Sequence, residues 1–320
     1  MANSIILDCD PGHDDVLALF LAAGSPAIDL VAVTTVAGNQ TIEKVTRNAL
    51  AAMAKANIRV PVAQGAALPL VQEQIVAPDI HGESGLDGPE LPEPQQDLDG
   101  RHAVDLIIDE VMARPAGTLT LVPIGPLTNI ALVVRKAPEI VERVKEVVLM
   151  GGSYTRGNRT PAAEFNIMAD PEAADIVFNQ DWKVTMVGLD LTHQAVATPQ
   201  VRRRIAAIDS PLATFVSEIL DHFSTAYMKR QGFADPPVHD MCAVAKVADP
   251  AVFVTVPGFV AVELTGTWTR GQTVVDFAHL LGREHRAQIA TELDWKRLWD
   301  MEIEAITALS GSTRENGQIL

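Results

Sequence analysis

Residues 4–23 read SIILDCDPGHDDVLALFLAA, and this stretch decides the fold. The apolar run over Ser4–Leu7 predicts a buried strand, and the longer apolar run over Val16–Ala23 predicts a helix that the following glycine and proline close. The segment between them, Asp8–Asp15, is predicted to be an acidic loop. A strand that leads through a loop into a helix begins a β-α-β unit, so the opening predicts a parallel sheet.

The alternation of strands and helices continues along the chain. Further strands are expected at 30–36, 59–63, 119–123, 146–150 and 183–189, and helices at 41–56, 102–113, 127–135 and 171–179. Thr41 is expected to cap the first of these helices. Alternating strands and helices predict an α/β fold: an open, mostly parallel sheet with helices on both faces.

The second half of the chain is more helical and adds an antiparallel piece. Helices are expected at 199–208, 211–229 and 294–309, and another is expected to start near His239 or Asp240. Strands at 259–264 and 273–277 alternate apolar and polar residues, which is typical of a small antiparallel addition at a sheet edge. Neither a repeat nor a linker divides residues 1–320, so a single domain is expected, with a frayed tail at 311–320.

Residues 66–100 break the regular pattern. The segment is rich in proline and has a glycine-rich centre, HGESGLDG, at 81–88. A structureless stretch of this length in a compact domain usually has a function. We therefore expect a lid over a binding site.

Composition excludes several classes of protein. The 320 residues carry 25 basic and 41 acidic side chains, a net charge of 25 − 41 = −16, and 48% are hydrophobic. This balance argues against nucleic-acid or anionic-membrane partners. The two cysteines, Cys9 and Cys242, lie far apart and are expected to be thiols in a reducing compartment. Neither a secretory signal nor a membrane span is recognised, so a cytoplasmic protein is expected.

The acidic loop has more carboxylates than a helix start needs. They are Asp8, Asp10, Asp14 and Asp15. One or two could cap the next helix, but four converging carboxylates would repel one another unless a cation were present. Carboxylates and carbonyls suit Ca²⁺ or Mg²⁺, whereas zinc favours histidine or thiolate. Asp240, at a loop–helix junction, is a candidate for the same site.

Polar groups also follow other predicted strands, where ligands of open α/β sheets bind. The candidates are Asn39, the carbonyl oxygen of Ile124, Asn158, Glu164 and Asn166. Structural roles are the alternatives: Asn39 as a turn residue, Thr128 as a helix cap and Asn166 as a loop anchor. Together with a hard cation, amides and carboxylates suit a polyhydroxylated ligand such as a sugar.

These motifs resemble those of the nucleoside hydrolases of the inosine-uridine preferring type. The matching blocks are DCDPGHDD at 8–15, AGN at 37–39, HGESGLDG at 81–88, GPLTN at 125–129, GG at 151–152, PAAEFN at 161–166, DPEAA at 170–174 and HD at 239–240. They occur in family order from residue 5 to about 250, so the resemblance covers most of the chain. It implies the nucleoside hydrolase fold and calcium-dependent hydrolysis of ribonucleosides to ribose and free base.

The resemblance also implies a role for individual residues. The implied calcium ligands are Asp10, Asp15, Asp240 and the main-chain oxygen of Ile124. Asp10 would also be the general base for the attacking water. The implied ribose ligands are Asp14, Asn39, Glu164 and Asn166, with Asn158 as a further contact. The lid at 66–100 would close over the ligand and exclude bulk water.

The base end of the implied site has histidines. His81 and His239 would line it, and either is a chemically reasonable proton donor to the leaving base. His13 together with His81 is similar to the pyrimidine-specific branch, which favours uridine and cytidine. That branch also uses polar groups from the helix that here contains Thr225, Tyr227 and Gln231, although Tyr227 on a plain helix surface is an equal alternative. A homodimer or homotetramer is implied as well.

The sequence leaves two alternatives to a nucleoside hydrolase. The Asp8-x-Asp10 pair superficially matches an aspartate-based phosphatase, but Gly12 stands where that chemistry wants a threonine. A calcium-dependent nucleoside- or sugar-binding module without turnover is the second alternative. Nucleotide cofactors are not expected, because neither a Gly-x-Gly-x-x-Gly nor a Walker-type loop follows a strand.

Overall fold

A nine-stranded sheet runs through the computed structural model, which describes residues 2–315. The strand order is β3-β2-β1-β4-β5-β6-β9-β7-β8. The bounds are β1 Asn3–Cys9, β2 Ile28–Thr35, β3 Val62–Gln64, β4 Leu119–Pro123, β5 Glu146–Met150, β6 Val184–Val187, β7 Phe253–Val262, β8 Thr273–Asp276 and β9 Ala287–Leu293. Strands β1 to β6 and β9 pair in parallel, and β7 is antiparallel to both β9 and β8. The predicted α/β class is therefore confirmed.

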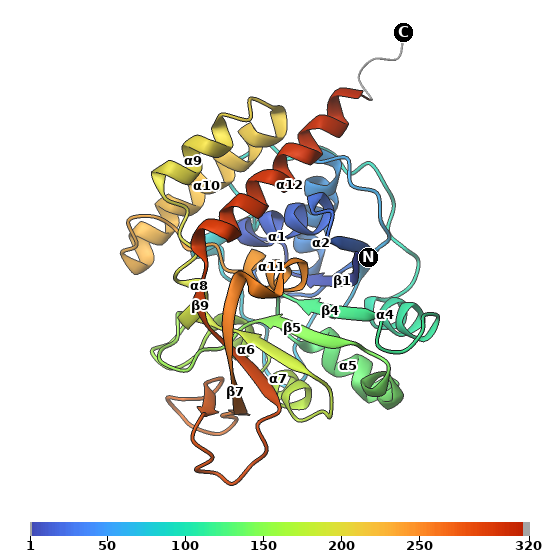
Figure 1. The fold of residues 1–320 in the computed structure, drawn as a ribbon, viewed down its shortest axis with the longest axis vertical. Coiled ribbons are helices and arrows are strands. Elements are labelled where there is room, and N and C mark those ends of the chain that lie inside the picture. The colour runs from blue at the N-terminus through green and yellow to red at the C-terminus, as the bar shows by residue number, and fades with distance from the viewer. Residues whose placement is uncertain (1, 316–320) are drawn as a thin grey trace.

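Helices cover both faces of the sheet (Figure 1). They are α1 His13–Gly24, α2 Ile42–Lys55, α3 Pro78–His81, α4 Ala103–Met112, α5 Thr128–Lys136, α6 Phe165–Ala169, α7 Pro171–Phe178, α8 Leu189–Thr192, α9 Pro199–Ala206, α10 Pro211–Gln231, α11 Met241–Ala248 and α12 Trp295–Glu315. Helices α1 and α9 to α12 pack on one face, and α4, α5 and α7 pack on the other. In Figure 1 the long red helix α12 lies along α1.

The middle of strand β1 is apolar because helices cover both faces of the sheet there. Ile5, Leu7 and Cys9 belong to the core under α1, whereas Ile6 belongs to the core under α4 and α5. Successive side chains of a strand point to opposite faces, and here helices cover both faces. Between Ser4 and Asp8 this strand therefore has only apolar residues.

The acidic segment is shorter as a loop than predicted. Strand β1 continues through Cys9 and helix α1 already begins at His13, so Asp14 and Asp15 lie in its first helical turn. The prediction that the helix starts at Val16 was wrong because Asp15 supports an earlier start. Its Oδ2 accepts the N–H of Gly12 at 2.9 Å, as an acidic side chain at this position of a helix does.

Several short or distant elements, the one-turn helix α3 among them, were not predicted. Strand β9 lies between β6 and β7, and its partners are remote in sequence, so only long-range pairing identifies it. Strand β7 also begins earlier than expected, at Phe253. Helices α6 and α8 are single turns, too short to show a helical period.

Two expected helix caps differ from the prediction. Thr41 occupies the N-cap position of α2, but its side chain makes no capping hydrogen bond. Thr128 is not a cap, since Leu127 holds that position of α5 and the Thr128 hydroxyl donates to Asp170 Oδ2 at 2.6 Å. Helix α12 continues to Glu315, and the rest of the expected frayed tail, 316–320, lies outside the described residues.

The sheet order places the predicted site. Strands β2 and β3 lie on one side of β1, and β4 and β5 lie on the other, so the winding direction reverses between β1 and β4. Ligands of open α/β sheets bind at the carboxyl ends of the strands beside such a reversal. Asp10, Asn39 and Ile124 follow the carboxyl ends of β1, β2 and β4, so they meet there. None of the helices in residues 2–315 combines the length and apolarity needed to cross a bilayer.

Candidate active site

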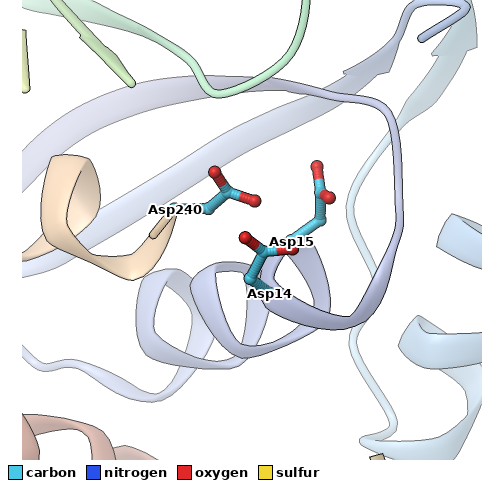
Figure 2. A group of neighbouring side chains, drawn as sticks. All are labelled: Asp14, Asp15 and Asp240. Atoms are coloured by element: carbon cyan, nitrogen blue, oxygen red, sulfur yellow. The ribbon is translucent and has the colours of Figure 1, made fainter. Parts of the chain in front are cut away.

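Three buried carboxylates converge at the start of α1. Asp14 and Asp15 come from its first turn and Asp240 precedes α11, and one oxygen of each lies within 4.8 Å of the others (Figure 2). Burial, with the neighbouring charge of Asp15, raises the pKa of Asp14 to about 8. Burial and the charges of the other aspartates also raise the pKa of Asp240 well above its usual value. Such a group is unfavourable alone and favourable around a cation.

Asp10 lies next to this group, and one of its two carboxylate oxygens accepts no hydrogen bond from the described residues. Its Oδ2 accepts the N–H of Asn39 at 2.7 Å, while its Oδ1 is buried and has no hydrogen-bond partner within the described part of the chain. Gly38 and Gly125 press against the same carboxylate, since a Cβ at either position would overlap its oxygens. Burial and the charge of Asp15 raise its pKa well above the usual value.

The donor set fits a hard divalent cation. Asp10, Asp15 and Asp240 would supply carboxylate oxygens, and the Ile124 carbonyl, which accepts Asn166 Nδ2 at 2.8 Å, keeps a second lone pair. Oxygen-only sites of this kind hold Ca²⁺ or Mg²⁺. Burial first, and then the charges of the neighbouring carboxylates, raise the pKa values of Asp10, Asp14 and Asp240, and a bound cation would offset both effects. Asp14, predicted as a ribose ligand, lies in the same group and borders the cavity.

The cavity above these carboxylates has a volume of about 280 Å³, near the lower end of small-molecule sites. Of the predicted site residues it is lined by Asp14, Asn39, His81, Ile124, Asn158, Glu164, Asn166, Tyr227, Gln231, His239 and Asp240. Asp10 and Asp15 lie beneath it, bonded to Asn39. The fold therefore brings together residues that the sequence scatters over more than 200 positions.

The loop after β5 is held by its own polar groups. Glu164 caps α6, and its carboxylate accepts N–H groups from Asn166 at 2.7 Å and Gly152 at 2.9 Å. Oδ1 of Asn158 accepts the N–H of Phe165 at 3.0 Å. Nδ2 of Asn166 bonds the carbonyl oxygens of Ile124 and Met150, so the loop-anchor interpretation of Asn166 is correct alongside its place in the cavity.

His239 is held between two hydroxyl groups. Its Nδ1 lies 2.7 Å from Thr192 Oγ1 and its Nε2 lies 2.7 Å from the Tyr227 hydroxyl. Burial, with a smaller effect of His193, lowers the pKa of His239 well below its usual value. Tyr227 is buried, so the alternative of a plain surface position was wrong. Thr192 was not predicted, since a lone threonine in a one-turn helix has no sequence signal.

A second pair of histidines has an assignable tautomer. Nε2 of His13 lies 2.8 Å from the carbonyl oxygen of Asp87, which only accepts, so a neutral His13 carries its proton there. Burial lowers the pKa of His13 to about 4, which keeps it neutral. Its Nδ1 then accepts from Nδ1 of His81 at 3.1 Å, which leaves Nε2 of His81 as an acceptor. The backbone N–H of His13 also approaches Nδ1 of His81, at 3.3 Å. The contact of His13 Nε2 with the Asp87 carbonyl is shorter, at 2.8 Å, so it decides which tautomers are assigned.

The structure also corrects and extends the list of site residues. Thr225 is exposed on α10, where its hydroxyl donates to the Asp221 carbonyl, so it points away from the cavity. Asp79, Arg159 and Arg230 line the cavity and were not predicted. Ordinary surface charges look the same in the sequence, and only the fold brings these three together.

Comparison with known proteins agrees with the geometry. The family model described as "Inosine-uridine preferring nucleoside hydrolase" matches residues 5–300. An inosine-uridine preferring nucleoside hydrolase of Leishmania major is 52% identical over 308 residues, 96% of this chain and 98% of that protein. The pyrimidine-specific ribonucleoside hydrolase RihA of Escherichia coli is 44% identical over 303 residues, 94% of this chain and 97% of the relative.

Solved structures have the same fold. A purine-preferring ribonucleoside hydrolase from Gardnerella vaginalis superposes with a TM-score of 0.90 at 34% identity, covering 96% of this chain and 99% of that one. With the family model and these relatives spanning nearly the whole chain, the protein belongs to the inosine-uridine preferring nucleoside hydrolase family, whose members are ribonucleoside N-glycosidases.

Proposed function

We propose that this enzyme hydrolyses pyrimidine ribonucleosides, uridine and cytidine, with a calcium ion held by Asp10, Asp15, Asp240 and the Ile124 carbonyl. The observation that carries the proposal is the buried Oδ1 of Asp10, which has no partner within the described residues and adjoins three further carboxylates. Oxygen ligands and uncompensated negative charge favour calcium over zinc.

Asp10 is the general base in this proposal. A bound calcium ion would polarise a water molecule and balance the charge of the carboxylates. Ca²⁺ acidifies water less than Zn²⁺ does, so a carboxylate must take the proton. A carboxylate oxygen has two lone pairs, so Oδ1 of Asp10 could meet the cation with one and the proton of the water with the other, while Asn39 N–H holds Oδ2 in place.

The ribose binds over the carboxylates. Its hydroxyls are expected to contact Asp14, Asn39, Asn158, Glu164 and Asn166. Cleavage of a glycosidic bond develops positive charge on the sugar ring, and surrounding carboxylates stabilise that charge. One displacement by water inverts the configuration at the anomeric carbon.

The base lies at the histidine end of the cavity. His239 is the candidate donor of a proton to the leaving base, a role that requires the bound substrate to raise the pKa that burial lowers. His81, whose Nε2 is an acceptor, is the candidate contact for the N–H groups of the base. Tyr227 and Gln231 border the same end, which supports pyrimidine recognition, as does the 44% identity to RihA. Inosine is the second candidate substrate, because a relative at 52% identity is named inosine-uridine preferring.

Release of ribose from uridine, cytidine, inosine and adenosine, read as reducing sugar, tests the proposal. We expect release from uridine and cytidine that Asp10→Ala abolishes and that exhaustive chelation lowers. Equal release from inosine would remove the pyrimidine preference and keep the hydrolase. Retention of intact nucleoside without ribose would instead indicate a binding module.

We also propose a cytoplasmic homodimer or homotetramer. Both thiols, Cys9 and Cys242, are buried and unpaired, as is usual in a reducing compartment. Sedimentation velocity of the full chain gives the oligomeric state, and a monomer at micromolar concentration would contradict that part of the proposal.

A further inference from the structure

The acidic side chain of Asp79, in the lid helix α3, binds two arginines from different parts of the fold. Nη1 of Arg159, in the loop after β5, lies 3.1 and 3.2 Å from its two oxygens. Nε of Arg230, near the end of α10, lies 2.8 Å from Oδ2, and Nη2 of Arg230 also contacts this oxygen. Arg159 additionally donates to the carbonyl of Val76 at 3.2 Å. We call the three charged residues the lid clamp.

The lid clamp lies at the cavity itself. All three of its side chains line the cavity, and α3 also contains His81, two residues after Asp79. Partial burial opposes ionisation of Asp79, but hydrogen bonds and charges from Arg230 and Arg159 outweigh it and lower its pKa. Asp79 is therefore ionised at neutral pH, and both arginines are charged at any physiological pH.

Other hydrogen bonds hold the glycine-rich part of the lid. Gln40 Nε2 donates to the Gly82 carbonyl at 3.3 Å, and Asn48 Nδ2 donates to the Ser84 carbonyl at 3.1 Å. With Lys44, whose ammonium group donates to the Glu83 carbonyl, these contacts fasten the lid to α2 and to the turn before it. The lid clamp is a charged link between α3 and the opposite rim, formed by α10 and the loop after β5, and it lies beside the stacking of His81 on Phe223 of α10.

We propose that Asp79 is a positioning residue: through Arg159 and Arg230 it holds α3, and with it His81, over the base-binding end of the cavity. This inference rests on the proposed function for its kinetic consequence. Asp79 acts on the closed state of the lid and not on the reacting atoms. Its loss should therefore change KM far more than kcat.

The size of the effect follows from population arithmetic. The dissociation constant of a ligand that needs the closed lid increases in proportion as the closed fraction falls. If Asp79→Asn lowers that fraction to about a tenth, KM for uridine rises about tenfold while kcat stays within about twofold. Side-chain exposure of 23% for Asp79 and 55% for Arg230 makes the ion pair sensitive to salt.

The test compares Asp79→Asn, Arg230→Gln and the double variant at about 50 mM and about 500 mM NaCl, on either side of physiological screening. We expect KM of the unmodified enzyme to rise with salt and KM of Asp79→Asn to start high and respond little. The double variant should resemble the single variants, because partners in one interaction are not additive. Arg230→Lys should recover part of the loss. Asp105→Asn, which removes an exposed ion pair with Lys136 on α4 and α5, is the matched control.

Hydrogen exchange of residues 76–82 gives a readout that does not need turnover. We expect about tenfold faster exchange there in Asp79→Asn and unchanged exchange in the core strands. Unchanged exchange of 76–82, or unchanged KM and salt response in active Asp79→Asn, would overturn the inference. An unmodified enzyme that releases no ribose would refute the proposed function, while exchange would still decide the role of the lid clamp.

Discussion

The hydroxyl group of Tyr227 lies 2.7 Å from Nε2 of His239, and both groups are buried at the base end of the cavity. Thr192 occupies the other ring nitrogen, so the imidazole has a partner on each side before substrate enters. A ring held in this way has one orientation, and its Nε2 shares a hydrogen bond with a phenol that also borders the cavity.

The first prediction concerns this pair. If His239 protonates the leaving base, His239→Ala should lower kcat for uridine by about 10²- to 10⁴-fold, the usual contribution of a general acid. Tyr227→Phe should lower it by about tenfold, because His239 keeps its place and loses one hydrogen bond. A 4-nitrophenyl riboside, whose leaving group needs no proton, should be cleaved by both variants at nearly the normal rate. An equal loss on both substrates would assign His239 a structural role.

The second prediction concerns cation removal and pH. Burial raises the pKa of Asp14 from 3.8 to about 8 in the folded chain without a cation. A raised folded pKa contributes stability below the unfolded value, and this stability is lost as pH rises between about 4 and about 8. The Tm of the calcium-free protein should therefore fall from pH 5 to pH 8.

Calcium should reverse this loss. At about 100 times its dissociation constant, calcium should stabilise the protein by about 2.7 kcal/mol, which is about 4 °C in Tm for a chain of this length. The gain should be larger at pH 8 than at pH 5, since the ionised carboxylates bind the cation. Magnesium at equal concentration is the control. A Tm gain that is independent of pH would show that the carboxylates are not the binding groups.

The third prediction concerns the backbone around Asp10. A methyl group at Gly125 would overlap Asp10 Oδ1, so Gly125→Ala should displace the carboxylate and lower kcat by about 10²-fold or more. Gly100→Ala is the matched control, because a Cβ there meets nothing within 4 Å. Calcium binding followed by calorimetry should weaken in Gly125→Ala alone. Normal activity in this variant would place the general base elsewhere.

The fourth prediction concerns a buried acid outside the site. Glu302 of α12 is fully buried, and neither carboxylate oxygen has a hydrogen-bond partner among residues 2–315. Burial raises its pKa well above the usual value of 4.5, so the folded protein keeps this carboxyl protonated where the unfolded chain ionises it, and stability falls as pH rises above 4.5. Glu302→Met should raise the free energy of unfolding by about 1 to 3 kcal/mol, and more at pH 8 than at pH 5. Glu304→Met, at an exposed position of the same helix, should change little.

Local patterns in the sequence determined the fold class and the residues at the strand ends that form the bottom of the cavity. The apolar runs of β1, β2, β4 and β5 show that these strands are covered on both faces, and polar residues at their carboxyl ends mark the ligand edge. Asp10, Asn39 and Ile124 were placed correctly for this reason, since a strand end and a turn are features of neighbouring residues.

The tertiary structure alone decided the rim and the proton arrangement. The ion pair of Asp79 with Arg230 spans 151 positions, and nothing near either residue identifies its partner. The same holds for Thr192 against His239 and for strand β9 beside β6. Hydrophobic periodicity specifies which face of an element is buried, but the pairing of two distant side chains depends on how whole elements pack. In this enzyme the sequence determined where the sugar and cation are expected, and packing decided which side chains form the rim of the cavity.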